Sequence, residues 1–275
     1  MTNVYISSDF EGIACVSHWD EVDDHFHEGA DDNYQEFRKI YTNELLSIFG
    51  GLDKLPSNEI VLKEAHSTAR NFLCQQLPSN VSIIRNFSGH IDEMMEGLRE
   101  DTDAVFLHGY HAAAGTNGNP LSHTINSQDV QEIRINDRTV GEVTISLYIA
   151  ATHHVPVCFI SGDSFAVKEA RQINPQIIGV ATKTCMGQSV ISQSPQKVNE
   201  QLLLQTTQAL HSFRKKPQQF EIKLPKEFKV EITYYKHQDA FFNASFPGVK
   251  QTNEKTIQFS HENFLEVMRL FHFCL

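Results

Sequence analysis

Two carboxylates near the start of the sequence, Asp9 and Glu11, have the residue type and the spacing to hold a metal ion. They follow directly on an apolar run over residues 4–7, and Gly12 comes next. If the backbone here is extended, side chains two positions apart point to the same side, and two anions so close repel each other unless a cation lies between them. Divalent metals take carboxylate oxygen readily. The alternative is a polar strand end whose carboxylates are solvated or cap the next helix.

Other side chains of ligand type follow later apolar runs of the sequence. They are Glu64 and His66 after residues 59–62, His108 and His111 after residues 104–107, and Glu142 within residues 133–146, a region that predicts a hairpin or a strand entering a helix. Because ligands of open α/β sheets bind beyond the carboxyl ends of the strands, parallel strands would bring these groups to one rim. Any single histidine is more simply a structural or surface residue. Several imidazoles and carboxylates together instead suit zinc, or a pair of zinc ions bridged by one carboxylate.

The segments that must position these residues alternate between strand and helix patterns. Short apolar runs predict strands, and apolar side chains repeating every three or four residues predict helices. One such helix, over residues 31–49, would end at Gly50 and Gly51, because glycine commonly terminates helices. Alternating strands and helices are typical of βαβ units. We therefore predict an α/β fold with a mostly parallel sheet flanked by helices and a smaller C-terminal α+β unit.

A polar break at residues 215–219, Lys-Lys-Pro-Gln-Gln, is the best candidate for a domain boundary. Residues 1–214 would form an α/β catalytic domain that carries the metal site. Residues 219–275 would form a small α+β unit that packs on the first domain and takes part in assembly. Its aromatic side chains Phe241, Phe242 and Phe246 are candidates for a contact surface, although they would equally well pack against the terminal helix.

The composition narrows the class of partner. A net charge of −11 argues against nucleic acid or an anionic membrane. No apolar run approaches the roughly 18 residues of a membrane span, and the first residues lack the pattern of a secretory signal. The five cysteines are scattered and form no C-x-x-C pair, which fits a reducing compartment. We expect a cytoplasmic protein with no nucleic-acid or membrane partner.

Five short motifs occur along the chain: D-x-E-G at residues 9–12, H-S at 66–67, G-Y-H-A at 109–112, S-H-T at 122–124 and V-G-E at 140–142. Together they resemble the D-aminopeptidase (DppA) family of zinc-dependent peptidases. The similarity covers essentially the whole chain. Each motif alone is weak, whereas their order and spacing together are specific.

The resemblance implies a site and an activity. It implies metal ligands at Asp9, Glu11, His66, His111 and Glu142, and a catalytic histidine at His123. It also implies zinc, with two ions per subunit, and hydrolysis of short peptides that carry D-amino acids at the N-terminus. The resemblance further implies a homo-oligomer, with a ring that encloses the active sites as its expected form. One departure is Glu64-Ala65 before His66, where the family has D-S; Glu64 is a candidate to orient the imidazole of His66.

Two other functions remain open alongside the peptidase. One is a related zinc amidase that acts on another dipeptide-like amide, and the other is a catalytically silent metal-binding protein of the same fold. A nucleotide-binding domain is not supported, because Gly12 stands alone, with neither G-x-G-x-x-G nor a P-loop lysine.

Overall fold

The computed structural model describes residues 2–23, 32–53 and 58–275. Its larger sheet, sheet A, has the strand order β3-β2-β1-β4-β7-β8-β9, and all neighbours pair in parallel except β8 and β9. The strands of sheet A are β1 (Thr2–Ser8), β2 (Asn58–Glu64), β3 (Val81–Ile84), β4 (Ala104–Tyr110), β7 (Val157–Asp163), β8 (Ile178–Met186) and β9 (Ser189–Ser192). The predicted α/β fold with a mostly parallel sheet is confirmed.

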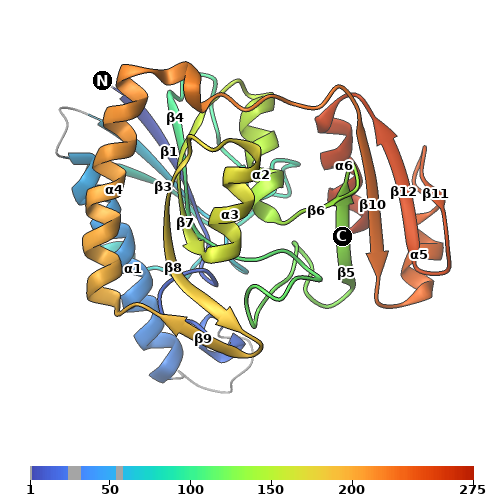
Figure 1. Cartoon of the computed structure of the whole chain (residues 1–275), viewed down its shortest axis with the longest axis horizontal. Helices are drawn as coiled ribbons and strands as arrows, with labels where there is room; N and C mark the ends of the chain where they lie inside the picture. Colours follow the sequence, from blue (N-terminus) through green and yellow to red (C-terminus); the bar gives the residue numbers. More distant parts are fainter. Residues whose placement is uncertain (1, 24–31, 54–57) are drawn as a thin grey trace.

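Helices cover both faces of sheet A (Figure 1). Helices α1 (Asp32–Asp53) and α4 (Pro195–Lys215) lie on one face, and α2 (Glu142–Thr152) and α3 (Ser164–Ile173) lie on the other. Strand β1 divides the hydrophobic core accordingly, because Val4 and Ile6 pack with residues of α1 and α4, whereas Tyr5 packs with residues of α2 and α3. Alternation of buried side chains on the two faces is what a central strand between two helical layers requires.

The prediction that α1 ends at Gly50 and Gly51 is wrong, because the helix continues to Asp53. The predicted start at Asp31 lies outside the described residues. Gly51 instead allows α1 and α4 to approach closely: a Cβ atom there would lie 2.6 Å from the carbonyl oxygen of Leu203 and 1.9 Å from Oγ1 of Thr206. Packing between the helices, rather than chain termination, explains this glycine.

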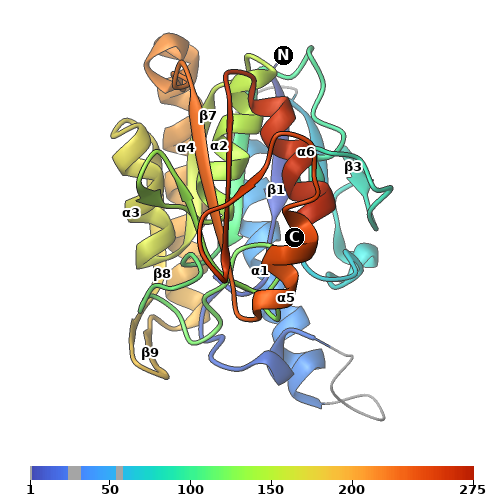
Figure 2. The same cartoon turned by 90° about the vertical axis from the view of Figure 1, so that its right-hand side faces the viewer.

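A second, antiparallel sheet, sheet B, lies beside the first (Figure 1 and Figure 2). Its strand order is β11-β12-β10-β5-β6, and α5 (His237–Asn243) and α6 (Phe264–Cys274) pack against it. The strands are β5 (Val130–Ile135), β6 (Arg138–Thr139), β10 (Phe228–Tyr234), β11 (Lys250–Gln251) and β12 (Thr256–His261). Sheet B therefore takes strands from both sides of the predicted boundary. The division into units 1–214 and 219–275 stays a prediction.

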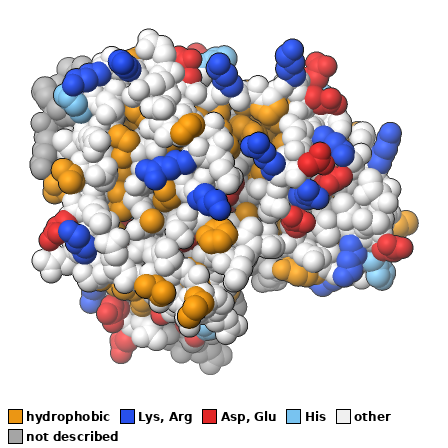
Figure 3. Space-filling view, in the orientation of Figure 1, with side chains coloured by type: hydrophobic (Ala, Val, Ile, Leu, Met, Phe, Trp, Pro, Cys, Tyr) orange, Lys and Arg blue, Asp and Glu red, His pale blue; other side chains and the backbone are white. Residues whose placement is uncertain are grey.

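The surface gives no sign of one dominant charge on the face that Figure 3 shows. Acidic and basic side chains are interspersed there, and apolar side chains form small groups. Among the helices of the described residues, we find none with the length and hydropathy of a membrane span.

Candidate metal centre

The loop that follows β1 carries Asp9 and Glu11. This loop is not the extended strand that the spacing argument assumed, since β1 ends one residue before Asp9. It crosses the end of β4, where the backbone N–H of Asp9 donates to the carbonyl of His108 at 2.8 Å and that of Gly12 donates to the carbonyl of Gly109 at 2.7 Å. The two carboxylates therefore meet because the loop is held against β4, not because of strand geometry.

Gly12 and Lys183 hold this loop from two sides. A Cβ atom on Gly12 would lie 1.9 Å from the carbonyl oxygen of Tyr110, so no other residue fits without moving the backbone. On β8, the buried Lys183 donates from Nζ to the carbonyl oxygens of Glu11 at 2.6 Å and Val16 at 2.5 Å. Burial lowers the pKa of Lys183 to about 8. Lys183 was not predicted from the sequence, because its partners are backbone atoms that no motif reveals.

His66, just after β2, faces both carboxylates of the loop. Its Nδ1 lies 2.7 Å from Oε2 of Glu11 and 3.5 Å from Oδ1 of Asp9. Its Nε2 lies 2.9 Å from the carbonyl oxygen of Val22, which can only accept a hydrogen bond. Nε2 must therefore carry the proton, and in the neutral ring the lone pair of Nδ1 points at the carboxylates. A metal ligand requires this tautomer.

His111, just after β4, forms a second group with Asp9 and Glu142. Its Nε2 lies 3.1 Å from Oε2 of Glu142 and 3.5 Å from Oδ2 of Asp9. Its Nδ1 lies 3.0 Å from the carbonyl oxygen of Ala112 and donates to it, which leaves the lone pair of Nε2 for the group. Glu142 is the first residue of α2. The carboxylate of Glu142 and the imidazole of His111 thus lie together although they belong to different elements.

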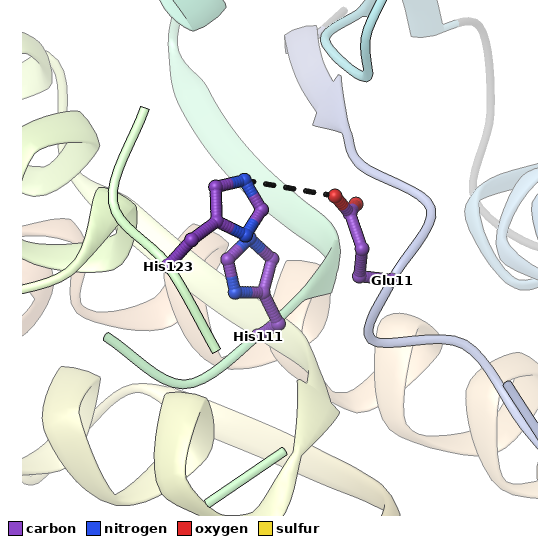
Figure 4. Close-up of side chains that lie close together, drawn as sticks. All are labelled: Glu11, His111 and His123. Carbon is purple, nitrogen blue, oxygen red and sulfur yellow. Dashed lines mark ion pairs between the residues drawn. The ribbon is translucent and has the colours of Figure 1, made fainter. Parts of the chain in front are cut away.

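His123 lies on the long loop after β4 and closes the cluster (Figure 4). Its Nε2 is 3.5 Å from Oε1 of Glu142 and 3.8 Å from Oε1 of Glu11, and its ring stacks on that of His111 with centroids 4.3 Å apart. Its Nδ1 donates to the carbonyl of Leu121 at 2.8 Å. Burial and the neighbouring His111 lower the pKa of His123, which favours a neutral ring with a free Nε2.

The donor set fits metal ions. Three groups each offer ligand atoms within 4.8 Å of one another. They are Asp9, Glu11 and His66; Asp9, His111 and Glu142; and Glu11, His111 and His123, so that Asp9 belongs to the first two groups. Within the part of the chain that the structure describes, three buried atoms of this cluster lack a hydrogen-bond partner: Oδ2 of Asp9, Oε2 of Glu11 and Nε2 of His111. Buried polar atoms are normally satisfied, and two divalent cations, one at each group that contains Asp9, would satisfy all three.

Electrostatics in the cluster also favour a cation. Burial raises the pKa of Asp9, and the adjacent Glu11 carboxylate raises it further. Burial by itself would lower the pKa of His66 and His111, but the carboxylates of Glu11 and Glu142 respectively raise it above the ordinary value. The buried carboxylates thus favour the protonated form of the neighbouring imidazoles, and they would favour a bound metal cation for the same reason.

A cavity of about 190 Å³ opens onto this centre. This is smaller than the roughly 300–1,000 Å³ of pockets for drug-sized ligands, so a compact ligand fits best. Besides Asp9, Glu11, His66, His123 and Glu142, its lining includes Ala65, Ser67, Phe87, Glu93, Met94 and Ile125.

Two residues of the predicted rim do not join the centre. Nε2 of His108 lies 3.2 Å from Oε2 of Glu44 on α1, in a buried pair. Glu64 accepts a hydrogen bond from the backbone N–H of Asn71. The suggestion that Glu64 orients His66 is wrong, because the Val22 carbonyl holds that ring instead. Both side chains support the loops around the site.

Glu169 on α3 is a further residue that sequence analysis missed. Helix α2 has no side-chain cap of its own at Gly141. The Glu169 carboxylate accepts hydrogen bonds from the backbone N–H groups of Gly141 at 2.8 Å and Thr144 at 3.2 Å. A carboxylate at a helix N-terminus is stabilising, and here it fixes the turn that carries Glu142. The available sequence signal was Gly141, which has no side chain to cap the start of α2 and so indicates that another residue must do so.

Comparisons with known proteins agree on one family. A family model described as D-aminopeptidase matches residues 2–273. A D-aminopeptidase of Bacillus subtilis (strain 168) is 30% identical over 268 residues, which cover 96% of this chain and 93% of the relative. A solved structure, the Zn-dependent D-aminopeptidase DppA from Bacillus subtilis, described as a self-compartmentalizing protease, superposes with a TM-score of 0.84 at 26% identity. That match covers 98% of this chain and 95% of the other.

Proposed function

Because the chain belongs to the D-aminopeptidase family and is a metallo-aminopeptidase, we propose that it removes D-amino acids from the N-terminus of short peptides through two zinc ions. The observation that supports the dinuclear site is the presence of Asp9 in two of the three ligand groups. One ion would be held by Asp9, Glu11 and His66, and the other by Asp9, His111 and Glu142. Asp9 would then contribute to both ligand sets, which its two carboxylate oxygens allow.

Bound zinc would polarise the scissile carbonyl and lower the pKa of a bound water toward 7. The residues of the chain supply the rest. His123 presents a free Nε2 beside Glu11 and Glu142, so it is placed to move a proton or to stabilise the tetrahedral oxyanion. Stacking on His111 fixes the plane of its ring. Ala65, Phe87, Met94 and Ile125 give the cavity apolar walls that limit water and favour small side chains.

Metal counting tests the dinuclear proposal. We expect two zinc ions per subunit in the parent protein, one in Glu142→Ala, which keeps the group of Asp9, Glu11 and His66, and fewer than one in Asp9→Ala. Inductively coupled plasma mass spectrometry on gel-filtered protein measures this directly. One ion in the parent would reject the dinuclear site but leave the enzyme class intact.

A substrate panel tests the activity. We expect hydrolysis of D-Ala-D-Ala, much slower hydrolysis of L-Ala-L-Ala, loss of both with chelator and recovery with zinc. Preference for the L-peptide would reject the D-residue proposal. Zinc binding with no hydrolysis of any dipeptide or amide would favour the catalytically silent alternative.

We also propose that the chain assembles into a homo-oligomer, with a ring that encloses the sites as its simplest form. The support is the relative described as a self-compartmentalizing protease. Of the aromatic side chains considered as a contact surface, Phe241 and Phe242 on α5 are 75% and 73% exposed. Phe246 is instead partly buried, with its ring 6.2 Å from that of Phe273 on α6, which is 67% exposed. Large exposed aromatic side chains in a group commonly mark contact surfaces.

A further inference from the structure

Glu93 lines the cavity without belonging to any of the three groups of candidate metal ligands. It opens the short 3-10 helix η3 (Glu93–Met95). Among the described residues of the lining, the other carboxylates are Asp9, Glu11 and Glu142, which are all proposed zinc ligands. Since zinc would neutralise those three, Glu93 is the lining carboxylate whose charge stays available to a substrate.

Two features fix the position of Glu93. Its backbone has φ of +46°, a left-handed conformation that residues other than glycine rarely adopt and that costs energy. Its Oε1 lies 2.8 Å from Nδ1 of His272 on the last turn of α6, a contact between residues 179 positions apart. The C-terminal helix therefore holds this carboxylate in the cavity wall.

The surroundings of Glu93 suit a cationic ligand. The described lining contains no lysine or arginine, and Phe87 and Met94 form apolar walls. The buried Lys63, whose Nζ lies 3.9 Å from the centre of the Phe87 ring, already donates to the carbonyl of Asn86 and lies 3.5 Å from Oε2 of Glu96. A carboxylate beside apolar walls attracts an ammonium ion more strongly than one in water does.

We propose that Glu93 binds an ammonium group of the peptide substrate, either the free α-ammonium or that of a basic side chain. The inference rests on the proposed peptidase function. It adds that Glu93 selects substrates that carry an ammonium group at this position. His272 contacts Oε1, so Oε2 is the oxygen that accepts from the ammonium, which has three N–H donors.

Asp92 offers a matched control next to Glu93. It too is a carboxylate paired with a histidine of another helix, since its Oδ2 lies 2.9 Å from Nε2 of His153 at the end of α2. Asp92 is not among the residues that line the cavity. Asp92→Asn therefore removes a negative charge next to Glu93 without changing a residue that lines the cavity.

The experiment compares zinc-loaded parent protein with Glu93→Gln, His272→Gln and Asp92→Asn. Calorimetry measures the affinity for D-alanine and for D-lactate, which has a hydroxyl in place of the ammonium. Hydrolysis of D-Ala-D-Ala, D-Ala-D-Lys and D-Ala-D-norleucine gives kcat/KM for each variant. Circular dichroism and thermal unfolding establish that each variant folds.

The expected result is a loss of about 10- to 100-fold for Glu93→Gln, the effect of one charge-assisted hydrogen bond. Weaker D-alanine binding with unchanged D-lactate binding identifies the α-ammonium. A loss confined to D-Ala-D-Lys identifies a basic side chain. His272→Gln keeps the carboxylate and should keep the preference, and Asp92→Asn should match the parent.

The inference is overturned if Glu93→Gln matches the parent in all arms. It is also overturned if Glu93→Gln and His272→Gln weaken every ligand equally, because the pair would then only tie α6 to η3. If instead the parent hydrolyses no peptide yet binds D-alanine over D-lactate through Glu93, the proposed peptidase function fails while ammonium binding stands.

Discussion

At the scale of single residues, His123 differs from His66 and His111 in where it is attached. His66 and His111 follow strands of sheet A directly, whereas His123 lies on the loop after β4 and is 12% exposed. All three rings donate one N–H to a backbone carbonyl and turn the other nitrogen into the cluster. His123 alone belongs to neither group that contains Asp9. A base that moves protons needs this combination of fixed tautomer and free nitrogen.

We predict that His123→Ala keeps its zinc content but loses about 10²–10⁴-fold in kcat, the usual contribution of a positioned proton-transfer group. Metal analysis and D-Ala-D-Ala turnover on the same sample measure both quantities. His123→Phe serves as the control for loss of ring stacking, because it keeps an aromatic ring beside His111 but has no nitrogen that can carry a proton. Turnover equal to that of the parent would remove His123 from the mechanism, and loss of zinc would make it a ligand.

The residue types of the site were predictable from the sequence because ligands to zinc are few and they follow apolar runs. Asp9, Glu11, His66 and His111 were selected in this way, and the structure places them in one cluster, although the geometric premise for Asp9 and Glu11 was wrong. The same argument also selected His108 and Glu64, which the structure turns toward Glu44 and Asn71. Glu93 and His272 were beyond reach, because a contact across 179 positions leaves no local pattern.

At the scale of elements, Lys183 shows how one strand controls the loop of its neighbour. The lysine reaches from β8 to the carbonyls of Glu11 and Val16. We predict that Lys183→Met weakens zinc binding about 10- to 100-fold, as loss of outer-shell partners does, because the loop with Asp9 and Glu11 loses its anchor. The two carbonyls left without a donor should lower the free energy of unfolding by about 2–3 kcal/mol.

Lys63→Met is the matched control for that variant. Lys63 is a second buried lysine that donates to a backbone carbonyl, that of Asn86, but not to the loop with the proposed ligands. It should lose stability and keep its zinc affinity. Competition against a chromophoric chelator measures the affinity, and urea unfolding measures the stability. Equal zinc affinity in both variants would contradict the anchoring role of Lys183.

The contact between α2 and the segment before η3 gives a dependence of stability on pH. The hydrogen bond to Asp92 raises the pKa of His153 above its ordinary value. A raised folded-state pKa stabilises the fold fully below about pH 6.5, where the unfolded chain also protonates this ring. The contribution is lost as the pH rises through the folded-state value. Because His153 is partly exposed, it amounts to about 1 kcal/mol at most.

Urea unfolding of the parent and His153→Gln at pH 6 and pH 9 tests this sign. We expect the parent to exceed the variant in stability at pH 6 and the difference to shrink at pH 9. A difference that grows with pH would show that His153 is held neutral in the folded protein.

The order of elements was more predictable than their ends and partners. Strand and helix patterns depend on local burial, so the parallel sheet followed from the sequence. The end of α1 did not, because Gly51 serves the contact with Thr206 of α4, far along the chain. The pairing of β5 with β10 joins Val130–Ile135 to a strand about 100 positions later, and nothing local specifies it.

At the scale of the whole molecule, the strand order places the centre where chemistry is expected. Sheet A runs from β1 outward to β2 and β3 on one side and from β4 to β7 and β8 on the other. Crossover connections diverge at such a point, which leaves an opening at the carboxyl ends of the strands. Asp9 follows β1 and His111 follows β4, the two strands that flank the opening. The topology, rather than any single contact, brings residues 9 to 142 together.

The exposed face of α5 and α6 makes assembly testable. Phe241 and Phe242 are among the most exposed apolar side chains of the described residues, and Asn243 ties α5 to α6 through the carbonyl of Cys274. An aromatic side chain buries roughly 150–250 Å², so a few of them supply a large part of the roughly 800 Å² that each partner buries in a stable interface. We predict that the double variant Phe241→Ser and Phe242→Ser elutes near the 31.2 kDa of one chain, whereas the parent elutes as an oligomer.

Light scattering after size-exclusion chromatography gives the mass, and Leu204→Ser on α4 is the control, since that side chain is 60% exposed on a different helix. The control should keep the mass of the parent.

If the oligomer encloses the sites, the dissociated variant should cleave D-Ala-D-Ala as the parent does and gain activity on longer peptides that an enclosed chamber excludes. A parent that elutes as one chain would reject assembly altogether. An oligomer that survives the double substitution would move the interface away from α5, and unchanged selectivity after dissociation would separate assembly from substrate exclusion.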